Sequence, residues 1–430
     1  MASAAKMSAR PEKLPAEILL KIFSYCSYSA LVTCIPFVCR WWQEVWKDRT
    51  LWRCIVYRPI CDRARIKYLL KLSPQFHAID LSSCDLDFSI VETMVQCCQD
   101  IHQLCMPMHA FWDYVKSKDT PIFSNIKVLI LTLEQHSSND LEYLGDNLPN
   151  LEHLEFQSHF CTKADLIYFL EKKKHKLRTL GLYCITSDGY CVLPLLSVCT
   201  NLNTLSLREF CGNVRNRHLE SVLQLRNVSS LALQYSSGFF FWGRVPTFTF
   251  FPNIVELQLY DYTVVGGDPF RVVAVNCPLL RKLSFHRSSS LQDRSLGNLH
   301  YFQKLTSVSI LNNHCITDWG MQQLETVPEL TYLDVYDCSK LTVECLKIIC
   351  NFRNLQVLKF DLGHWDSPID LKAGGDRSLQ LNVSDIKNRA LHLMFYRWRD
   401  LTTFDHLRKE NIRVTMLEDK EETLGKSLLL

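Results

Sequence analysis

The sequence predicts an α/β fold in which short parallel strands alternate with returning helices to form a right-handed solenoid. The main observation is a frame, apolar-x-x-apolar-x-apolar, that recurs every 25 or 26 residues. A unit of this length fits one strand and one helix, and it buries its apolar face only against its neighbours. The frame opens twelve times, at Phe76, Ile101, Ile126, Leu151, Leu177, Leu202, Val228, Ile254, Leu280, Leu305, Leu330 and Leu355.

The copy that opens at Leu305 shows the frame most clearly. Its other apolar positions are Val308 and Ile310, and Thr317-Asp318 then precede a helical stretch. This pattern is typical of a leucine-rich repeat, which implies a curved parallel sheet with helices on its convex side. We therefore expect about twelve repeats over residues 76–370.

After Leu355 the period fails, and an irregular cap is expected over residues 371–417. Alternating apolar residues near 379–383 predict a strand, and Ser384-Asp385 can cap a helix that includes Leu391, Met394, Phe395 and Trp398. A last strand is expected over 412–416, followed by a flexible tail over 418–430.

Composition and charge are those of an ordinary soluble globular protein. Hydrophobic residues make up 47% of the chain, charged residues 22%, and the net charge is +3. That charge is too small to predict a nucleic-acid partner. The uncharged stretch 22–39 contains Pro36 and several hydroxyl side chains, so it predicts two short helices and no membrane span.

The cysteines indicate reduced thiols. There are 19 of them, an odd number spread along the chain, and no signal-peptide pattern opens the sequence. The expected location is therefore the cytoplasm, the nucleus or both. No paired Cys-x-x-Cys sets with zinc spacing occur, so neither a metal nor another cofactor is expected.

The N-terminal part carries three motifs in a fixed order. They are Leu14-Pro15-x-Glu17-Ile18-Leu19, then Val38-Cys39-Arg40-x-Trp42, then Asp48-x-x-Leu51-Trp52. Proline at a first helical position and apolar residues every three or four positions predict short amphipathic helices. Together the motifs resemble an F-box, with Cys26 in place of the usual leucine.

The resemblance implies a three-helix module over residues 11–52 that docks on the Skp adaptor of a cullin-RING (SCF) ubiquitin ligase. Residues 1–10 are expected to be disordered, and 53–75 to form a connecting helix that joins the module rigidly to the repeats. A simpler alternative is that the helices only cap the first repeat. The expected adaptor-binding residues are Leu14, Pro15, Ile18, Leu19, Ile22, Phe23, Val38, Trp42, Leu51 and Trp52.

Positions 3, 5 and 7 of each frame point away from the core, because side chains alternate along a strand, and they are expected to line the concave face. Tyrosine and arginine dominate many protein interfaces. The candidate substrate-binding residues are Tyr183, Arg208, Tyr260, His286, Tyr332 and Tyr336. Tyr260, His286, Leu311 and Tyr336 occupy position 7 of consecutive copies and should form a ladder. Tyrosine is also simply common in strands.

Aromatic residues crowd the segment 239–251, where other copies place a helix. They either fill the interior of that copy or form a docking patch.

No catalytic residues are expected. The sequence has no G-x-G-x-x-G, P-loop, G-x-S-x-G or H-E-x-x-H motif. It therefore predicts a non-catalytic substrate-recognition subunit of an SCF-type ubiquitin ligase with a protein substrate. The alternative is a leucine-rich-repeat scaffold that is not coupled to ubiquitin transfer.

Overall fold

The computed structural model describes residues 14–52, 56–58, 63–72, 76–117, 123–132, 141–157, 163–183, 193–208, 225–234, 253–261, 269–289, 291–350, 352–361, 391–396 and 413–417. The chain divides into two compact units on either side of residue 158. Each unit is an α/β structure in which parallel strands follow one another in sequence order.

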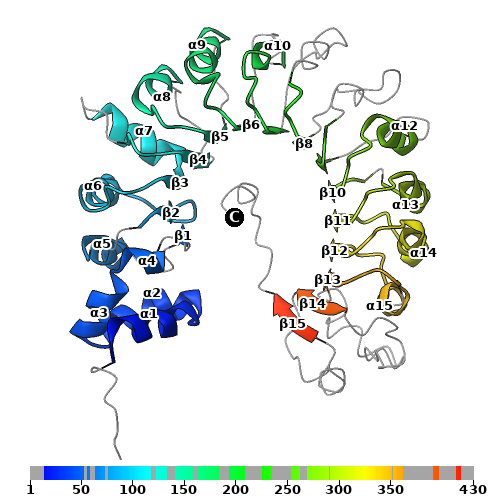
Figure 1. Ribbon diagram of the computed structural model, residues 1–430, viewed down its shortest axis with the longest axis horizontal. Coiled ribbons are helices and arrows are strands. Elements are labelled where there is room, and N and C mark those ends of the chain that lie inside the picture. Colours follow the sequence, from blue (N-terminus) through cyan, green and yellow to red (C-terminus); the bar gives the residue numbers. More distant parts are fainter. Residues whose placement is uncertain are drawn as a thin grey trace, which may run out of the picture. The chain divides into compact units, whose positions relative to one another are not determined.

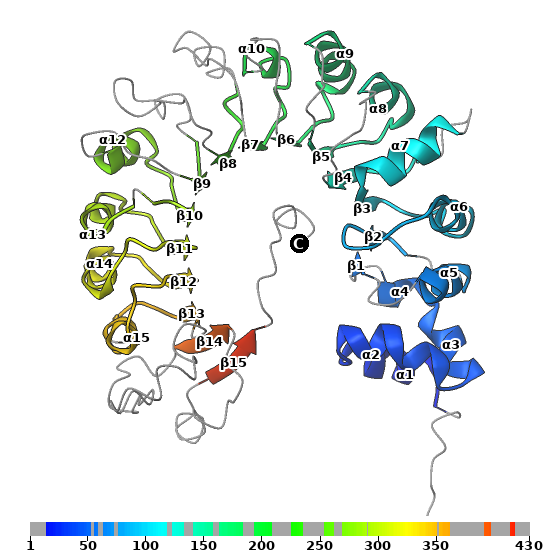
Figure 2. The ribbon, with the colours of Figure 1, turned by 180° about the vertical axis from the view of Figure 1, so that it is seen from behind.

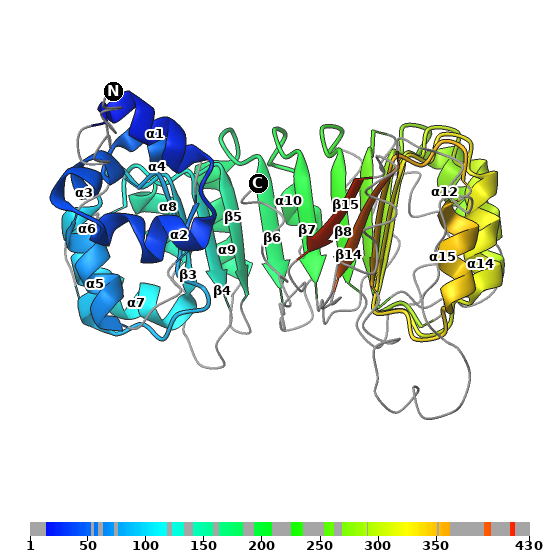
Figure 3. The same ribbon diagram turned by 90° about the horizontal axis from the view of Figure 1, so that it is seen from below.

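The first unit begins with short helices. They are α1 (Ala16–Ser24), α2 (Tyr28–Thr33), the 3-10 helix η2 (Ile35–Phe37), α3 (Arg40–Trp46), α4 (Arg49–Trp52) and α5 (Arg63–Lys71). The Ser27 hydroxyl caps α2 by accepting from the amide of Ala30 at 3.3 Å, which separates α2 from α1 as predicted (Figure 3). No helix in the described part of the chain is both long and apolar enough to cross a membrane.

The repeats of the first unit follow these helices. Their strands are β1 (Val56–Tyr57), β2 (Ala78–Asp80), β3 (Gln103–Pro107), β4 (Val128–Thr132) and β5 (His153–Gln157), and their helices are α6 (Phe88–Cys97), α7 (Met108–Lys116) and α8 (Leu141–Asn147). The pairing is parallel and keeps equal frame positions side by side: Leu104 pairs with Ile79 and with Leu129. β1 is an extra strand that the frame did not predict.

The second unit contains the remaining elements. Its strands are β6 (Thr179–Tyr183), β7 (Thr204–Arg208), β8 (Ser230–Gln234), β9 (Glu256–Tyr260), β10 (Lys282–His286), β11 (Ser307–Leu311), β12 (Tyr332–Tyr336), β13 (Val357–Asp361), β14 (His392–Tyr396) and β15 (Arg413–Leu417). Its helices are α9 (Lys163–Lys173), α10 (Leu193–Leu196), α12 (Pro269–Asn276), α13 (Asp293–Gly297), η5 (Asn298–Tyr301), α14 (Asp318–Gln323), η6 (Leu324–Thr326) and α15 (Val343–Cys350).

The helices of each unit lie on one side of its strands. Figure 1 shows α12 to α15 stacked beside β10 to β13, and Figure 2 shows α5 and α6 beside the first strands. From β3 to β13 the strands occupy positions 3 to 7 of the predicted frame. The side chains at positions 1, 4 and 6 form the core: Leu305, Val308 and Ile310 are fully buried. The predicted leucine-rich-repeat solenoid is thereby confirmed.

A column of asparagines links successive copies. Each stands directly before a frame opening and donates its side-chain amide to a backbone carbonyl of the preceding copy, as Asn227 does to Thr200 at 2.7 Å. Asn125, Asn150, Asn201, Asn253 and Asn354 make the same bond. These bonds give the backbone carbonyls at the turns a hydrogen-bond partner.

A second column links the helix starts of three copies. The Asp293 carboxylate accepts from the amide and hydroxyl of Thr317, both at 2.7 Å, and Asp318 accepts from the same groups of Thr342. The backbone at residue 320 can lie this close to Asp293 because residue 320 is a glycine. A Cβ atom there would lie 2.8 Å from Asp293 Cα.

The residue after each of four strands has left-handed backbone geometry. Asp261, Arg287, Asn312 and Asp337 have φ between 50° and 54°. In the first three the amide donates to the last residue of the next strand, as Asn312 does to the Tyr336 carbonyl at 2.8 Å. Asp and Asn tolerate this geometry. Arg287 does not favour it, and its guanidinium pairs with the Asp261 carboxylate at 3.3 Å.

The helix expected around Leu391 to Trp398 is wrong where the structure describes it. Residues 392–396 form β14, which pairs in parallel with β13, and β15 confirms the last expected strand. Leu391 and Leu393 are both buried. Burial at every second residue is the pattern of a strand, although the apolar residues of this segment are also spaced as in a helix. The expected strand at 379–383 and the aromatic segment 239–251 lie outside the described residues.

Candidate functional site

The short helices of the first unit close around an aromatic core. The indole Nε1 of Trp46 donates to the Leu31 carbonyl at 2.8 Å, and that of Trp52 to the Trp46 carbonyl at 2.7 Å. The two indoles meet edge to face with ring centroids 5.1 Å apart. Four of the expected adaptor-binding residues belong to this core and are buried, namely Leu19, Phe23, Leu51 and Trp52.

Other apolar side chains of the same helices face solvent. Ile18 is 48% exposed, Ile22 40% and Val38 55%. Pro15 is exposed, whereas Leu14 and Trp42 are half-buried, and the Trp42 ring lies 5.2 Å from that of Phe23. The expected binding residues therefore divide into an exposed group and a group that supports it from the core.

Sequence reasoning missed three exposed aromatic residues here, Tyr25, Phe37 and Trp41. Trp41 is fixed at the start of α1, because its indole donates to the Leu14 carbonyl at 3.0 Å. Tyr25 lies seven residues after Ile18, one further position on the same helix face, so helical spacing could have identified it. We call Ile18, Ile22, Tyr25, Val38 and Trp41 the exposed apolar set.

The third sequence motif has a local structural role at α4. The Asp48 carboxylate accepts from the Thr50 hydroxyl at 2.6 Å and from the Thr50 amide at 2.8 Å. These two hydrogen bonds hold the pKa of Asp48 below its usual value, although burial opposes them, and the positive charge of Arg49 contributes less. Asp48 thus orients the turn that directs Leu51 and Trp52 into the core.

In the second unit, the predicted ladder at position 7 is present. His286 pairs with Tyr260 on one side and Leu311 on the other, and Leu311 pairs with Tyr336. The Tyr260 and His286 rings stack with centroids 4.1 Å apart, and the Tyr260 hydroxyl donates to Gln258 Oε1 at 3.1 Å. Tyr260 is buried, whereas His286 and Tyr336 are half-buried.

Tyr332 anchors the other end of β12 on the same face. Its hydroxyl donates to the Asp334 carboxylate at 3.5 Å, and Lys359 Nζ lies 5.4 Å from the centre of its ring. Burial raises the pKa of Tyr332, and the neighbouring negative charge of Asp334 raises it further. The hydroxyl therefore stays protonated at neutral pH. Side-chain surroundings of Tyr183 and Arg208, which end β6 and β7, lie outside the described part of the structure.

The odd positions of the first unit differ from what was expected. Cys105, Val128 and Ile130 were predicted to line the open face, but they form a buried apolar cluster. Asp80 and Glu155 are buried in the same columns. Apolar side chains adjacent on one sheet face gather out of water, so this part of the sheet does not offer the open surface that the sequence predicted.

The arrangement of α1 to α4, with three ordered motifs around one aromatic core, agrees with a known family. Residues 11–58 match the F-box-like family model. We call this part the F-box-like domain. A search of curated proteins gave no match to the chain.

Several solved structures resemble the chain at low identity. The internalin InlF of Listeria monocytogenes is 14% identical, with 94% of this chain and 95% of that chain covered and a TM-score of 0.36. Yeast Rad7, in its complex with Elc1, is 14% identical over 88% and 92% of the two chains, with a TM-score of 0.40. TLR13, in its complex with ssRNA13, is 15% identical over 82% and 44%, also at 0.40. Likeness at this level says nothing about what this chain binds.

Side-chain contacts on two sides join the short helices of the F-box-like domain to the elements that follow them. Arg65 of α5 donates to the Thr33 carbonyl at 2.7 Å and lies 4.7 Å from the centre of the Phe37 ring, which also stacks on Tyr68. On the other side, the Tyr28 hydroxyl bonds the backbone of Arg58. The Arg58 side chain in turn pairs with Asp80 of β2 at 3.1 Å.

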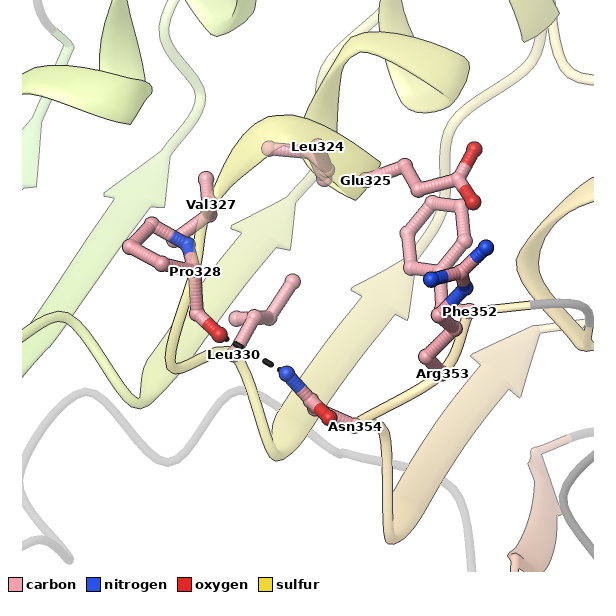
Figure 4. Close-up of a pocket in the computed structure, with 8 residues that line it drawn as sticks. All are labelled: Leu324, Glu325, Val327, Pro328, Leu330, Phe352, Arg353 and Asn354. Carbon is pink, nitrogen blue, oxygen red and sulfur yellow. Dashed lines mark hydrogen bonds between the residues drawn. The ribbon is translucent and has the colours of Figure 1, made fainter.

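A small pocket of about 240 Å³ lies at the turns before β12 and β13 (Figure 4). Phe352 and Leu330 form its base, Glu325 and Arg353 extend at its edge, and the bond from Asn354 to the Pro328 carbonyl crosses it at 2.8 Å. It is smaller than most ligand sites, which exceed about 300 Å³. We assign the pocket to repeat packing. A separate group, His77, Asp100 and His102, has the donor atoms to hold a metal ion.

Proposed function

We propose that this chain is a substrate receptor of an SCF-type ubiquitin ligase. In this proposal the F-box-like domain binds a Skp adaptor, and the face of the repeats opposite the helices binds a protein substrate. The observation that carries it is the exposed apolar set on the F-box-like domain. The proposed compartment is the cytoplasm, the nucleus or both.

The exposed apolar set is suited to binding because of its composition. Isolated exposed hydrophobic residues are normal on protein surfaces, but several on one small domain mark an interaction site. Burying one aliphatic side chain of this size contributes on the order of 1 to 3 kcal/mol. The buried Leu19 and Phe23 lie on the same helix as Ile18 and Ile22, so the core fixes the orientation of the side chains offered to the adaptor.

The contacts of Arg65 and Tyr28 support the proposal because they connect the F-box-like domain firmly to the repeats. A substrate receptor acts by holding its substrate at a defined place in the ligase, which requires a stiff connection between its two binding surfaces. α5 packs on η2 through Arg65 and Tyr68, and β1 pairs with β2. The domain and the first repeat thus form a continuous structure.

On the substrate side, the proposal places binding near Tyr260, His286, Tyr332 and Tyr336. The stacked Tyr260 and His286 rings and the hydrogen-bonded Tyr332 are held in place before any partner arrives. Rigid aromatic side chains lose little conformational entropy on binding, which suits them as anchors.

Co-purification with a Skp adaptor tests the proposal. Changing Ile18 and Ile22 together to Glu should abolish binding of adaptor and cullin, because two charges would be desolvated in an apolar interface. Ile167→Glu on α9, where the isoleucine is 39% exposed, is the matched control and should bind normally. Unchanged binding of the double variant would contradict the proposal and leave a scaffold unconnected with ubiquitin as the better interpretation.

A further inference from the structure

Two histidines in the first unit stand at the same place in successive copies. His77 directly precedes β2 and His102 directly precedes β3. Their imidazole rings stack with centroids 4.1 Å apart and planes 21° apart. The backbone holds the two residues together, because the amides of His102 and Gln103 both donate to the His77 carbonyl, at 2.9 and 3.1 Å.

Asp100 adds a carboxylate to this pair. It lies in the turn after α6, and its side chain is 52% exposed. Its carboxylate oxygen is 3.8 Å from Nδ1 of His102. One donor atom from each of the three side chains can be chosen so that all lie within 4.8 Å of one another.

A hydrogen bond defines which nitrogen of His102 is available. Nδ1 of His102 lies 2.9 Å from the Asp100 backbone carbonyl. A carbonyl only accepts, so Nδ1 carries the hydrogen, and in the neutral ring Nε2 carries the lone pair. Histidines that ligate metals commonly donate their other ring N–H to a backbone carbonyl in this way.

We propose that His77, Asp100 and His102 bind a zinc ion. Two imidazoles and one carboxylate are a known donor set for Zn²⁺, with a fourth position left for water, whereas Mg²⁺ and Ca²⁺ prefer all-oxygen sites. In a tetrahedral site with Zn–N bonds of about 2.1 Å, two nitrogens lie about 3.4 Å apart. The donor atoms of the three side chains already lie within 4.8 Å of one another, so the side chains would have to close on the ion by a small movement.

The site would join the first two copies of the repeat next to the F-box-like domain. Ligands that belong to two copies tie those copies together in the folded state only, so bound metal stabilises the fold by mass action. The ligand spacing of 25 residues is the repeat period and not a recognised zinc motif, which explains why motif inspection of the sequence does not find it.

Titration of the full chain with Co²⁺, as a spectroscopic probe for Zn²⁺, tests the proposal. We expect visible absorption bands of one tetrahedral ion per chain, without the near-ultraviolet thiolate band that cysteine ligands produce, and Zn²⁺ should displace the signal. His102→Gln should weaken binding by tenfold or more. His300→Ala is the control, since His300 also has Nδ1 against a backbone carbonyl, at 2.6 Å, but lies in the second unit.

Unchanged Co²⁺ affinity in both His77→Gln and His102→Gln would overturn the inference, and so would a spectrum dominated by thiolate ligation. If a histidine variant fails to fold by circular dichroism, Asp100→Asn decides, because the exposed Asp100 side chain can be changed without disturbing the core. It should also bind Co²⁺ more weakly, and unchanged affinity in this variant would equally refute the site.

Discussion

The ring of Phe76 packs edge-on against the indole of Trp52, with ring centroids 4.8 Å apart. Phe76 opens the first copy of the repeat, whereas Trp52 ends α4 of the F-box-like domain. Phe76 also stacks on Tyr57 of β1 at 4.2 Å. The domain and the first repeat therefore share one core.

Phe76→Ala should destabilise both parts together. Removing a buried phenylalanine from a core costs about 3 to 5 kcal/mol, and here the lost contacts belong to both sides. Urea unfolding followed by circular dichroism and by tryptophan fluorescence, to which Trp46 and Trp52 contribute among nine tryptophans, measures the effect. Phe88→Ala should cost much less, because Phe88 is 44% exposed. Loss of the repeats with an intact F-box-like domain would show that the core is not shared.

Gly320→Ala should destabilise the second unit. The added methyl group would overlap the side chain of Asp293, with the backbone Cα atom of that residue only 2.8 Å away. Overpacking of this kind costs about 1 to 3 kcal/mol. Gly297→Ala is the matched control, since its Cβ would meet Gln323 at ordinary distances of 3.7 Å or more. Equal melting temperatures for the two variants would refute the expectation.

Asp87→Ala should remove the N-cap of α6, where Asp87 accepts from the Ile90 amide at 2.9 Å. The hydrogen bond from Ser89 is the main cause that lowers the pKa of Asp87. The folded-state pKa is thus below the unfolded value of about 3.9. The stabilisation is present above that value and is lost as pH falls through the folded-state pKa. Denaturant titrations should show a difference of about 1 kcal/mol at pH 7 that vanishes in acid.

Buried thiols should resist alkylation. Burial raises the pKa of Cys98, Cys199 and Cys338 to about 12, so at pH 8 only about one thiol in ten thousand is the reactive thiolate. Iodoacetamide labelling read by mass spectrometry should modify the exposed Cys34 before these three buried thiols. Denaturant should then make the three buried thiols reactive. Rapid labelling of Cys338 in the native protein would contradict this placement.

Tyr260→Ser combined with Tyr336→Ser should weaken capture of a protein substrate by more than tenfold. Aromatic anchors contribute upwards of about 2 kcal/mol each at interfaces, and about 1.4 kcal/mol is one decade in affinity. Affinity purification followed by quantitative mass spectrometry measures the loss of bound proteins. Adaptor binding should be unchanged, because that surface belongs to the F-box-like domain. Undiminished capture would direct attention to other parts of the chain.

The strand positions could be predicted from the sequence because burial alternates along a strand. The frame at Leu305, Val308 and Ile310 therefore predicted a strand that opens near Leu305, and β11 spans Ser307–Leu311. β14 could not be predicted in the same way, since Leu391 and Phe395 also fit a helix. Hydrogen bonds between copies, such as the one between Asp293 and Thr317, join residues 24 positions apart. A pattern of neighbouring residues cannot predict them.

The candidate adaptor surface was only partly predictable. Helical spacing placed Ile18 and Leu19 on one broad apolar stripe, but only the packed structure shows that Leu19 faces the core and Ile18 faces solvent. Trp41 was missed because the motif directs attention to its neighbour Trp42. The direction of each side chain depends on the crossing of α1 and α3, which local sequence does not define.

The Asp293 and Asp318 links suggest how this chain could change its length. Each aspartate holds the threonine one copy later, and Thr317 and Thr342 are 25 residues apart. Loss of one such block from a gene would bring Asp293 against Thr342, with Cys345 in place of Gly320 at the close approach. Cys345 already occupies the position equivalent to Gly320 beside the Asp318–Thr342 link, so a cysteine is tolerated at this position. Loss or tandem duplication of one such block therefore leaves an aspartate and a threonine in place to form the link at the new junction.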